Sequence, residues 1–130
     1  MISSGKIVVD TDVLIDFFRG YPAAVDFINR PSTVATISSV TITELYSGVK
    51  SDKEAADIKS FLETIEIINV DKAIARDGGL IRKQYSRSHG TAIIDSIIAA
   101  TSLIFRRPLA TLNQKHYPMI KDLVIPYQKF

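Results

Sequence analysis

Two acids interrupt an apolar run near the start of the chain, in the stretch "KIVVDTDVLIDFF" at residues 6–18. Asp10 and Asp12 are two positions apart and follow three consecutive apolar residues. A carboxylate beside a buried strand is costly unless it caps a helix or meets a cation. Asp12 is the better placed N-cap for the helix that follows, which leaves Asp10 as the stronger functional candidate. Asp16, one turn later, is expected to be a solvated helix residue.

A third acid, Asp95, stands in the apolar stretch "HGTAIIDSIIAAT". Its neighbours one helical turn away are not basic, so no ion pair within the helix can neutralise it. A position near the positive end of the helix dipole stabilises a carboxylate by only about 0.3–1 kcal/mol. Asp95 is therefore predicted to be functional, and the competing explanation is a salt bridge to a distant Arg or Lys.

Two further polar residues are ambiguous on spacing alone. Thr41 and Glu44 match the S/T-x-x-E capping box, which would explain Glu44 without any chemistry. Asn113 could ligate a metal, bond a phosphate or begin a turn. His89 and His116 are expected to be structural, because neither has a His or Glu partner at helical spacing. The sequence contains no G-x-S-x-G elbow, Walker A loop or G-x-G-x-x-G motif, which argues against a serine hydrolase or a nucleotide-binding protein.

Short apolar strands and helical patterns alternate along the chain and must position these residues. The predicted strands are 6–9, 34–37, 66–69, 108–111 and 123–126. A helix over 51–65 begins with a Ser51–Glu54 capping box, another begins near Asp71, and an apolar helix covers 91–107. This alternation predicts a single α/β domain over residues 1–130, with a central parallel sheet of about five strands and helices on both faces.

In open parallel sheets, ligands bind beyond the carboxyl ends of the strands. Asp10 follows the first predicted strand, and Thr111 and Asn113 lie at the end of the fourth. We therefore expect the acids to face one crevice. Carboxylates gathered there would repel one another unless a cation were bound. Oxygen ligands without sulfur or a His pair favour Mg²⁺, with Mn²⁺ as an alternative, and such sites typically hydrolyse phosphate esters.

Composition limits the class of protein. The chain has no cysteine, which excludes disulfides and zinc–thiolate sites, and its net charge of +2 permits nucleic-acid contact without requiring it. Hydrophobic residues make up 46% of the chain, which favours a protein that covers part of its surface with a partner. No apolar run is long enough to span a membrane, and "MISSGK" at the start lacks a signal region, so a cytoplasmic location is expected.

Four segments resemble, in order, the signature segments of PIN-domain nucleases, and most closely those of VapC toxins. They are "VVDTDVLIDFFRG", "SSVTITELYSGV", "HGTAIIDSIIAATSLI" and "PLATLNQKHYPMI". The resemblance places the family's acids, and thus the metal ligands, on Asp10, Glu44 and Asp95. Its fourth acidic position falls on Asn113, with Thr111 just before it. Asp12 stands where relatives often have Asn or Ser, in keeping with a supporting, capping role.

The resemblance also implies an activity and partners. It implies a Mg²⁺-dependent endoribonuclease that acts on structured RNA at exposed single-stranded sites, a homodimer, and a small VapB-like antitoxin that silences the toxin. Four basic residues near the acidic segments are candidate phosphate contacts, namely Arg82, Lys83, Arg87 and Lys115.

An excess of aromatic residues follows the first acidic motif, in "VLIDFFRGYPAAVDFI". Phe17, Phe18, Tyr21 and Phe27 are too many for the buried stripes of two short helices. With Tyr46 of the Glu44 helix, they predict an apolar surface that a partner covers. The resemblance to VapC toxins implies that this partner is an antitoxin helix bound close to the acids. The alternative is that both faces of these helices belong to the core.

Two other functions compete with the nuclease. A phospho-receiver module would have acids after the first strand, Asp71 after the third, Thr111 after the fourth and a late Lys129, but it leaves Asp95 unexplained. A haloacid-dehalogenase-type phosphatase fits "DTDVL", but the chain lacks that family's later pair of acids. The sequence therefore predicts a metal-dependent ribonuclease.

Overall fold

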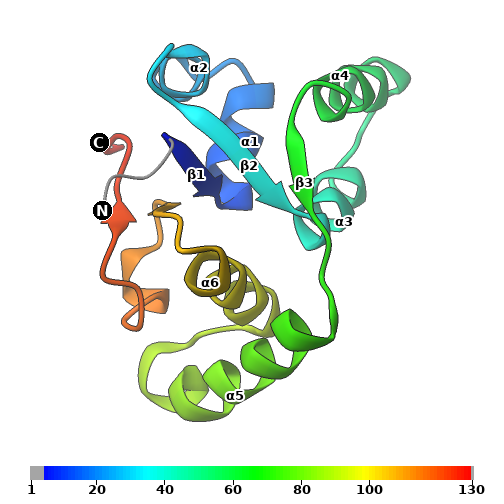
Figure 1. Ribbon diagram of the computed structural model, residues 1–130. Helices are drawn as coiled ribbons and strands as arrows, with labels where there is room; N and C mark the ends of the chain where they lie inside the picture. The colour runs from blue at the N-terminus through cyan, green and yellow to red at the C-terminus, as the bar shows by residue number, and fades with distance from the viewer. Residues whose placement is uncertain (1–4, 130) are drawn as a thin grey trace.

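A computed structural model describes residues 5–129 and shows a parallel sheet between two layers of helices (Figure 1). Its strands are β1 (Lys6–Val9), β2 (Val34–Ser38), β3 (Glu66–Ile68), β4 (Leu109–Ala110) and β5 (Leu123–Val124). They lie in the order β3-β2-β1-β4-β5, and every neighbouring pair is parallel. The predicted α/β fold and all five predicted strands are thus confirmed, although the last two strands are shorter than expected.

Within the described residues, six α-helices cover the sheet. They are α1 (Thr11–Phe18), α2 (Pro22–Asn29), α3 (Ser39–Ser47), α4 (Asp52–Leu62), α5 (Lys72–His89) and α6 (Ile93–Phe105), and a short 3₁₀ helix η1 (Gln114–His116) follows β4. The predicted helix starts at Ser51 and near Asp71 are confirmed, and the side chains of these two residues accept the backbone N–H of Glu54 and Ile74. No helix within residues 5–129 is long and apolar enough to cross a membrane.

The strand residues alternate between two cores. Ile7 and Val9 of β1 point into a core with α1, α2, α3 and α4, whereas Val8 points into the core formed with α5 and α6. On the second side α5 and α6 approach closely at Gly78, where an added Cβ would lie 3.2 Å from Ile97 Cα. Both faces of β1 are therefore buried, which explains its uninterrupted apolar sequence.

The strand order reverses at β1, which pairs with β2 on one side and β4 on the other. Asp10 directly follows β1, and its backbone N–H donates to Ala110 O at the end of β4 (2.9 Å). The carboxyl ends of these strands form the topological switch point at which open α/β sheets bind ligands.

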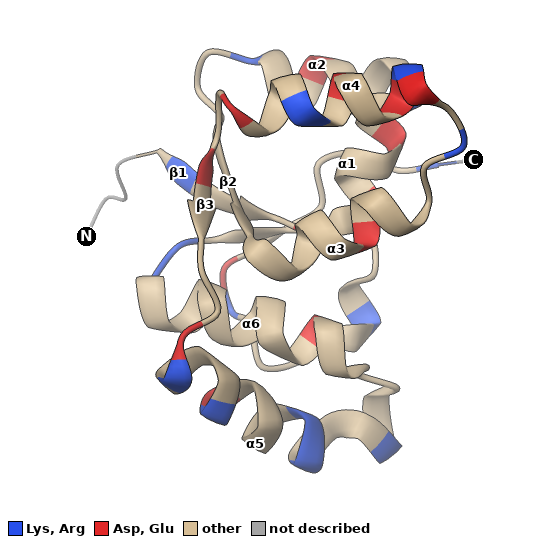
Figure 2. Cartoon of the chain, turned by 90° about the vertical axis from the view of Figure 1, so that its right-hand side faces the viewer, with Lys and Arg blue, Asp and Glu red and all other residues tan. Residues whose placement is uncertain are grey.

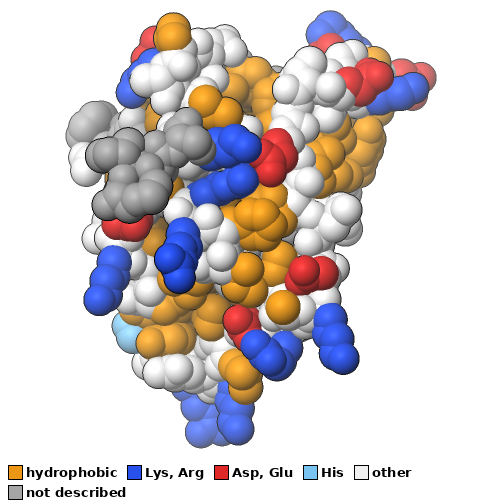
Figure 3. Space-filling view, viewed as in Figure 1, with side chains coloured by type: hydrophobic (Ala, Val, Ile, Leu, Met, Phe, Trp, Pro, Cys, Tyr) orange, Lys and Arg blue, Asp and Glu red, His pale blue; other side chains and the backbone are white. Residues whose placement is uncertain are grey.

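The amino ends of the strands, on the side of the sheet away from Asp10, carry paired charges. Lys6 Nζ lies 3.2 Å from Glu66 Oε1, and Arg107 NH1 lies 3.3 Å from Glu66 Oε2. Figure 3, viewed as in Figure 1, shows exposed hydrophobic side chains between groups of charged ones on this face. Basic and acidic side chains are thus paired at the strand starts, in contrast to the acids at the strand ends.

Two sequence predictions, the Asp12 cap and a solvated Asp16, are wrong, and so is the Thr41–Glu44 capping box that the sequence left open. The N-cap of α1 is Asp10, whose side chain accepts the Thr11 N–H, and Asp12 lies inside the first turn. The N-cap of α3 is Ser38, so Thr41 and Glu44 lie within the helix and do not form its capping box. Asp16 is buried rather than solvated. In each case a tertiary contact, described below, engages the side chain.

Candidate active site

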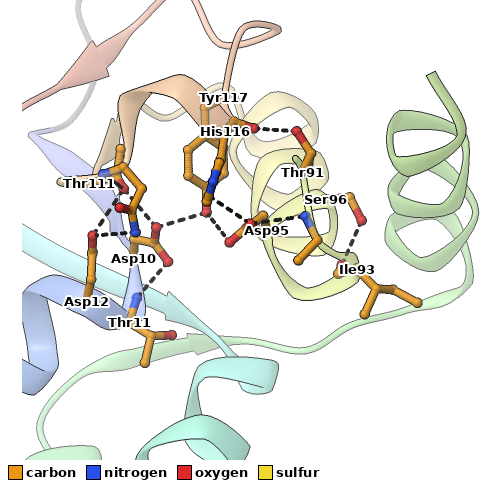
Figure 4. Close-up of polar contacts among 12 residues, drawn as sticks. Asp10, Thr11, Asp12, Thr91, Ile93, Asp95, Ser96, Thr111, His116 and Tyr117 are labelled. Atoms are coloured by element: carbon orange, nitrogen blue, oxygen red, sulfur yellow. Dashed lines mark hydrogen bonds and ion pairs between the residues drawn. The ribbon is translucent and has the colours of Figure 1, made fainter. Parts of the chain in front are cut away.

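Asp10 is buried at the end of β1 and accepts hydrogen bonds from neutral groups. Its Oδ2 accepts from Thr111 Oγ1 (2.8 Å) and from the Tyr117 hydroxyl (2.9 Å), and its Oδ1 accepts from Thr11 N (2.8 Å) (Figure 4). Burial and the nearby charge of Asp12 raise the pKa of Asp10 to about 7, although these hydrogen bonds act in the opposite direction. In the part of the chain that the structure describes, no positively charged side chain pairs with this carboxyl group.

Asp12 attaches helix α1 to the loop that follows β4. Its Oδ2 accepts from Leu112 N (3.0 Å) and Asn113 Nδ2 (3.2 Å), and its Oδ1 accepts from Val13 N (2.8 Å). Burial raises the pKa of Asp12 against these backbone hydrogen bonds. The predicted supporting role of Asp12 therefore takes the form of a bridge to Asn113 rather than an N-cap. In the same loop, Thr111 Oγ1 accepts from Asn113 N (3.0 Å).

Asp95 enters the site from the first turn of α6. The chain reaches this helix through Gly90, which ends α5 with a φ of 65°. Asp95 Oδ2 accepts from Ala92 N (3.2 Å) and lies 3.3 Å from His116 Nδ1, while the Tyr117 hydroxyl is 3.3 Å from its Oδ1. Among the described residues, the basic side chain beside Asp95 is thus a histidine, rather than the distant Arg or Lys considered above.

Glu44 approaches from α3, on the other side of Thr11. The Thr11 hydroxyl donates to Glu44 Oε1 and also contacts Thr41 Oγ1 (3.1 Å), while the Thr11 backbone N–H donates to Asp10. One residue therefore links two of the predicted acids. This contact, rather than a capping box, explains the position of Thr41.

The donors available in the crevice fit a hard cation. Asp10, Asp95 and Glu44 supply carboxylate oxygens only, and no Lys or Arg within residues 5–129 forms an ion pair with Asp10, Asp12 or Asp95. In the described part of the chain no three Asp, Glu or His side chains lie close enough together to enclose an ion. The site therefore consists of two carboxylates, Asp10 and Asp95, which contact the same Tyr117 hydroxyl. Glu44 is linked to Asp10 through Thr11.

Two residues of the crevice were missed by the sequence reasoning. Tyr117 is buried with its hydroxyl between Asp10 and Asp95, and His116, expected to be structural, faces Asp95. Both belong to the segment that also contains Asn113. A buried tyrosine needs a partner for its hydroxyl, which is a general signal but does not say which residue the partner is.

The predicted RNA contacts are exposed on the α5 side of the molecule. Arg82, Lys83 and Arg87 lie on α5, and Lys115 lies on η1. Figure 2 shows Lys and Arg positions along α5, which runs beside the acid-bearing helix α6. These basic residues are thus free of the core, and their role stays a prediction.

A groove between α1, α3 and α4 has a volume of about 130 Å³ and is lined by residues that include Phe18, Leu45, Ile58 and Glu44. Glu44 lines this groove and is linked through Thr11 to Asp10, so one end of the groove lies near the acidic site. The groove is also lined by two basic residues, Arg19 and Lys50, and two acidic residues, Glu54 and Asp57.

The aromatic residues assigned to one docking surface are divided among four environments. Phe17 packs against Phe18 and Phe61 beside the groove, with ring centroids 5.2 Å apart in both cases. Tyr21 packs against Tyr127 and Phe27 is buried in the core, while Tyr46 is 41% exposed. Of the four predicted antitoxin contacts (Phe17, Phe18, Tyr21 and Tyr46), Phe18 is the one that lines the groove.

Comparison with known proteins identifies the family. The protein-family model described as "PIN domain" matches residues 7–119 of this chain. Ribonuclease VapC19 of Mycobacterium tuberculosis is 36% identical over 124 residues, which cover 92% of this chain and 98% of that protein. The chain belongs to the PIN-domain family, in its VapC branch. The matched range of the PIN domain includes Asp10, Glu44, Asp95 and Asn113.

Solved structures agree with this assignment. A chain of a toxin–antitoxin complex from Klebsiella pneumoniae superimposes on this PIN domain with a TM-score of 0.81 and 29% identity, covering 95% of this chain and 99% of that one. A chain of DNA-bound VapBC from Salmonella typhimurium has a TM-score of 0.73 and 26% identity, with 92% and 95% covered. The PIN fold is thus shared over nearly the whole chain.

Proposed function

We propose that this PIN domain is a Mg²⁺-dependent endoribonuclease toxin that hydrolyses RNA phosphodiester bonds, with Mn²⁺ as an alternative ion. The observation that carries the proposal is the meeting of Asp10 and Asp95 at the carboxyl edge of the sheet without a Lys or Arg partner among the described residues. Its relatives are named ribonucleases, which supports the same activity here. Asp71, the residue a phospho-receiver would modify, instead caps α5.

The residues of the crevice have distinct roles in this proposal. Asp10 and Asp95 would hold the ion, and Glu44, fixed by Thr11, would orient the attacking water. Asn113 donates one amide N–H to Asp12, which leaves its second amide N–H for a substrate phosphate at the carboxyl ends of the strands. A bound Mg²⁺ would lower the pKa of water and stabilise the charge on the leaving oxygen.

A cleavage assay with matched variants tests the activity. RNA should be cut by the wild-type chain in Mg²⁺ and left intact in EDTA. Asp95→Asn keeps the shape but removes the charge, so cleavage should fall by more than about 100-fold, because even outer-shell partners of a metal are worth about 10- to 100-fold. Asp77→Asn, at a surface ion pair with Arg76 on α5, is the control and should cleave normally. Equal cleavage by the Asp95 variant would rule out this site.

The proposal includes a VapB-like antitoxin that places a helix in the groove at Phe18. Structures of relatives are titled as VapBC or toxin–antitoxin complexes, which supports a partner of this kind. Because Glu44 lines the groove, a bound segment would end beside the acids and could place a basic side chain there. The charged rim of the groove suits a segment with both apolar anchors and charges.

We also propose that the toxin forms a homodimer. Leu80 of α5 and Ile93 of α6 are 57% and 58% exposed, and the two helices pack together as one layer. Exposed large apolar side chains on a rigid pair of helices support contact with a second copy. Sedimentation of the wild type and of Leu80→Asp should give a dimer and a monomer, whereas a monomeric wild type would refute the dimer.

A further inference from the structure

The Tyr117 hydroxyl lies between the two carboxylates that are proposed to bind the ion. It is 2.9 Å from Asp10 Oδ2 and 3.3 Å from Asp95 Oδ1, as Figure 4 shows. These carboxylates come from different elements, the end of β1 and the first turn of α6. The hydroxyl is the single group that contacts both of them among the described residues.

The position of this hydroxyl is fixed, because the Tyr117 ring is packed in the core. The Tyr117 ring is 1% exposed and belongs to the core formed with Ile98 and Leu109. Its backbone follows η1, which is attached to the start of α6 by the hydrogen bond from Thr91 Oγ1 to His116 O (2.7 Å). The same hydrophobic core that packs against the sheet therefore keeps the Tyr117 hydroxyl between Asp10 and Asp95.

A phenol can satisfy two carboxylates only in part. It has one proton, so it can donate to one of them at a time, and the shorter distance favours Asp10. A divalent cation attracts both carboxylates at once and binds their oxygens at about 2.1 Å. An ion shared by Asp10 and Asp95 would therefore compete for the place that the hydroxyl occupies.

We propose that the Tyr117 hydroxyl is a placeholder that holds Asp10 and Asp95 together in the metal-free protein and releases at least one of the two carboxylates when the ion binds. This inference rests on the proposed metal site and makes Tyr117 a positioning residue that sets the affinity for the ion. The hydroxyl stabilises the metal-free state selectively, so its removal should favour the metal-bound state by the same amount. A hydroxyl that instead organised the ligands for the ion would have the opposite effect.

The variant Tyr117→Phe tests the direction of this effect. It keeps the buried ring and removes only the hydroxyl. Calorimetric titration with Mg²⁺ should show affinity raised by about three- to tenfold, the range expected when one net hydrogen bond is removed from the metal-free state alone. The thermal midpoint in EDTA should fall, and the deficit should shrink in saturating Mg²⁺. Unchanged or weaker Mg²⁺ binding would overturn the proposal.

A second tyrosine provides the matched control. Tyr85 lies on α5, where its ring contacts His89 with centroids 5.8 Å apart. Tyr85→Phe removes the same atom from a partly buried ring away from the carboxylates, so Mg²⁺ affinity should not change. An equal rise in both variants would show that the effect does not belong to the Tyr117 hydroxyl, and would also overturn the proposal.

The wild-type chain allows a test that does not depend on folding of a variant. It has five tyrosines and no tryptophan, so labelling at the tyrosine Cζ gives five carbon resonances. A resonance that is absent from the Tyr117→Phe spectrum should shift when Mg²⁺ is added, because the hydroxyl changes its hydrogen bonds. If Mg²⁺ binds and none of the five resonances moves, the hydroxyl does not respond to the ion and the proposal fails.

The outcomes also separate this inference from the proposed function. If the wild type neither binds Mg²⁺ nor cleaves RNA, both fail together. If the wild type binds Mg²⁺ and cleaves RNA but Tyr117→Phe binds the ion no more tightly, the ribonuclease remains and the placeholder alone is overturned.

Discussion

Helix α1 begins at one buried aspartate and contains another, and the two have opposite electrostatic environments. Asp10, its N-cap, accepts hydrogen bonds only from neutral donors, and burial raises its pKa to about 7. Burial also acts to raise the pKa of Asp16, but hydrogen bonds from Lys129 Nζ and the Tyr127 hydroxyl, both 2.7 Å, and the charge of Lys129 outweigh it, so the pKa is lowered.

The difference shows how to separate a structural acid from a functional one. Asp16 is matched by a cation that the chain itself provides, and it fastens the C-terminal segment onto α1. Asp10 has no such partner among residues 5–129, so its charge is unfavourable in the free protein and available to an external cation. Asp10 and Asp16 are both buried aspartates of helix α1 or its cap. They differ in whether a cation of the chain pairs with the carboxylate, and this difference decides the role of each. Five changes test this contrast.

The largest effect is expected in metal binding. Asp10→Asn should weaken Mg²⁺ binding by more than about 100-fold, because a ligand should matter more than an outer-shell partner. Asp16→Asn should leave Mg²⁺ binding within about twofold, because Asp16 is already satisfied by Lys129 and Tyr127. Calorimetry measures both. Unchanged Mg²⁺ binding in both Asp10→Asn and Asp95→Asn would show that these acids are not the ligands.

The second change compares two aromatic residues near the end of α1. Phe18→Asp places a charge in the groove and should weaken binding of the cognate antitoxin by about 30-fold or more, the scale of an interface hot spot. Tyr21→Phe, on the side covered by Tyr127, should not change this binding. Binding is measured by titration, and RNA cleavage by the free toxin should persist in both variants. Equal antitoxin affinity for Phe18→Asp would place the partner elsewhere.

The third change measures stability without metal. Asp16→Asn should lower the free energy of unfolding in EDTA by about 1.5–3 kcal/mol, the value of hydrogen bonds to a charged group. Asp10→Asn should not destabilise the protein above pH 7, because it removes a charge that Asp12 repels. Urea unfolding at pH 8 provides both values. A decrease in the Asp10 variant as large as that in the Asp16 variant would contradict the contrast.

The fourth test uses pH. The pKa of Asp10 is raised from 3.8 to about 7, so its contribution to stability is complete below pH 3.8 and is lost as the pH rises towards 7. The pKa of Asp16 is lowered, so its contribution is present above pH 3.8 and is lost as the pH falls. Between pH 4 and 7 in EDTA, the wild type should lose stability relative to Asp10→Asn by at most about 1.4 kcal/mol per pH unit. Parallel curves would refute the assignment.

The smallest effect concerns exposed charges, which lack both burial and fixed partners. The triple variant Arg82→Ala, Lys83→Ala and Arg87→Ala should lower the salt dependence of RNA binding by about 0.7 for each phosphate that the protein no longer neutralises. Lys53→Ala with Lys59→Ala on α4 is the control, because both are exposed on the opposite helical layer. Binding is measured at several salt concentrations. An unchanged slope in the triple variant would remove this patch from the RNA interface.

The fold and the positions of the acids follow from local features of the sequence. All five strands, the Ser51 cap and the helix start near Asp71 could be predicted, because hydrophobic periodicity and capping depend on residues that are neighbours in the sequence. The same reasoning placed Asp10 at the end of a strand beside Thr111, where a parallel sheet brings its ligands together.

The use of each acid, in contrast, depends on tertiary contacts that no local pattern reveals. Sequence spacing favoured Asp12 as the cap and a solvated Asp16, yet Asp12 bonds Asn113, 101 positions away, and Asp16 bonds Lys129, 113 positions away. Tyr117 reaches Asp10 across 107 positions and was not recognised. The physical reason is that the pKa and role of a carboxylate depend on which charges and donors surround it in space, and long-range packing selects those neighbours.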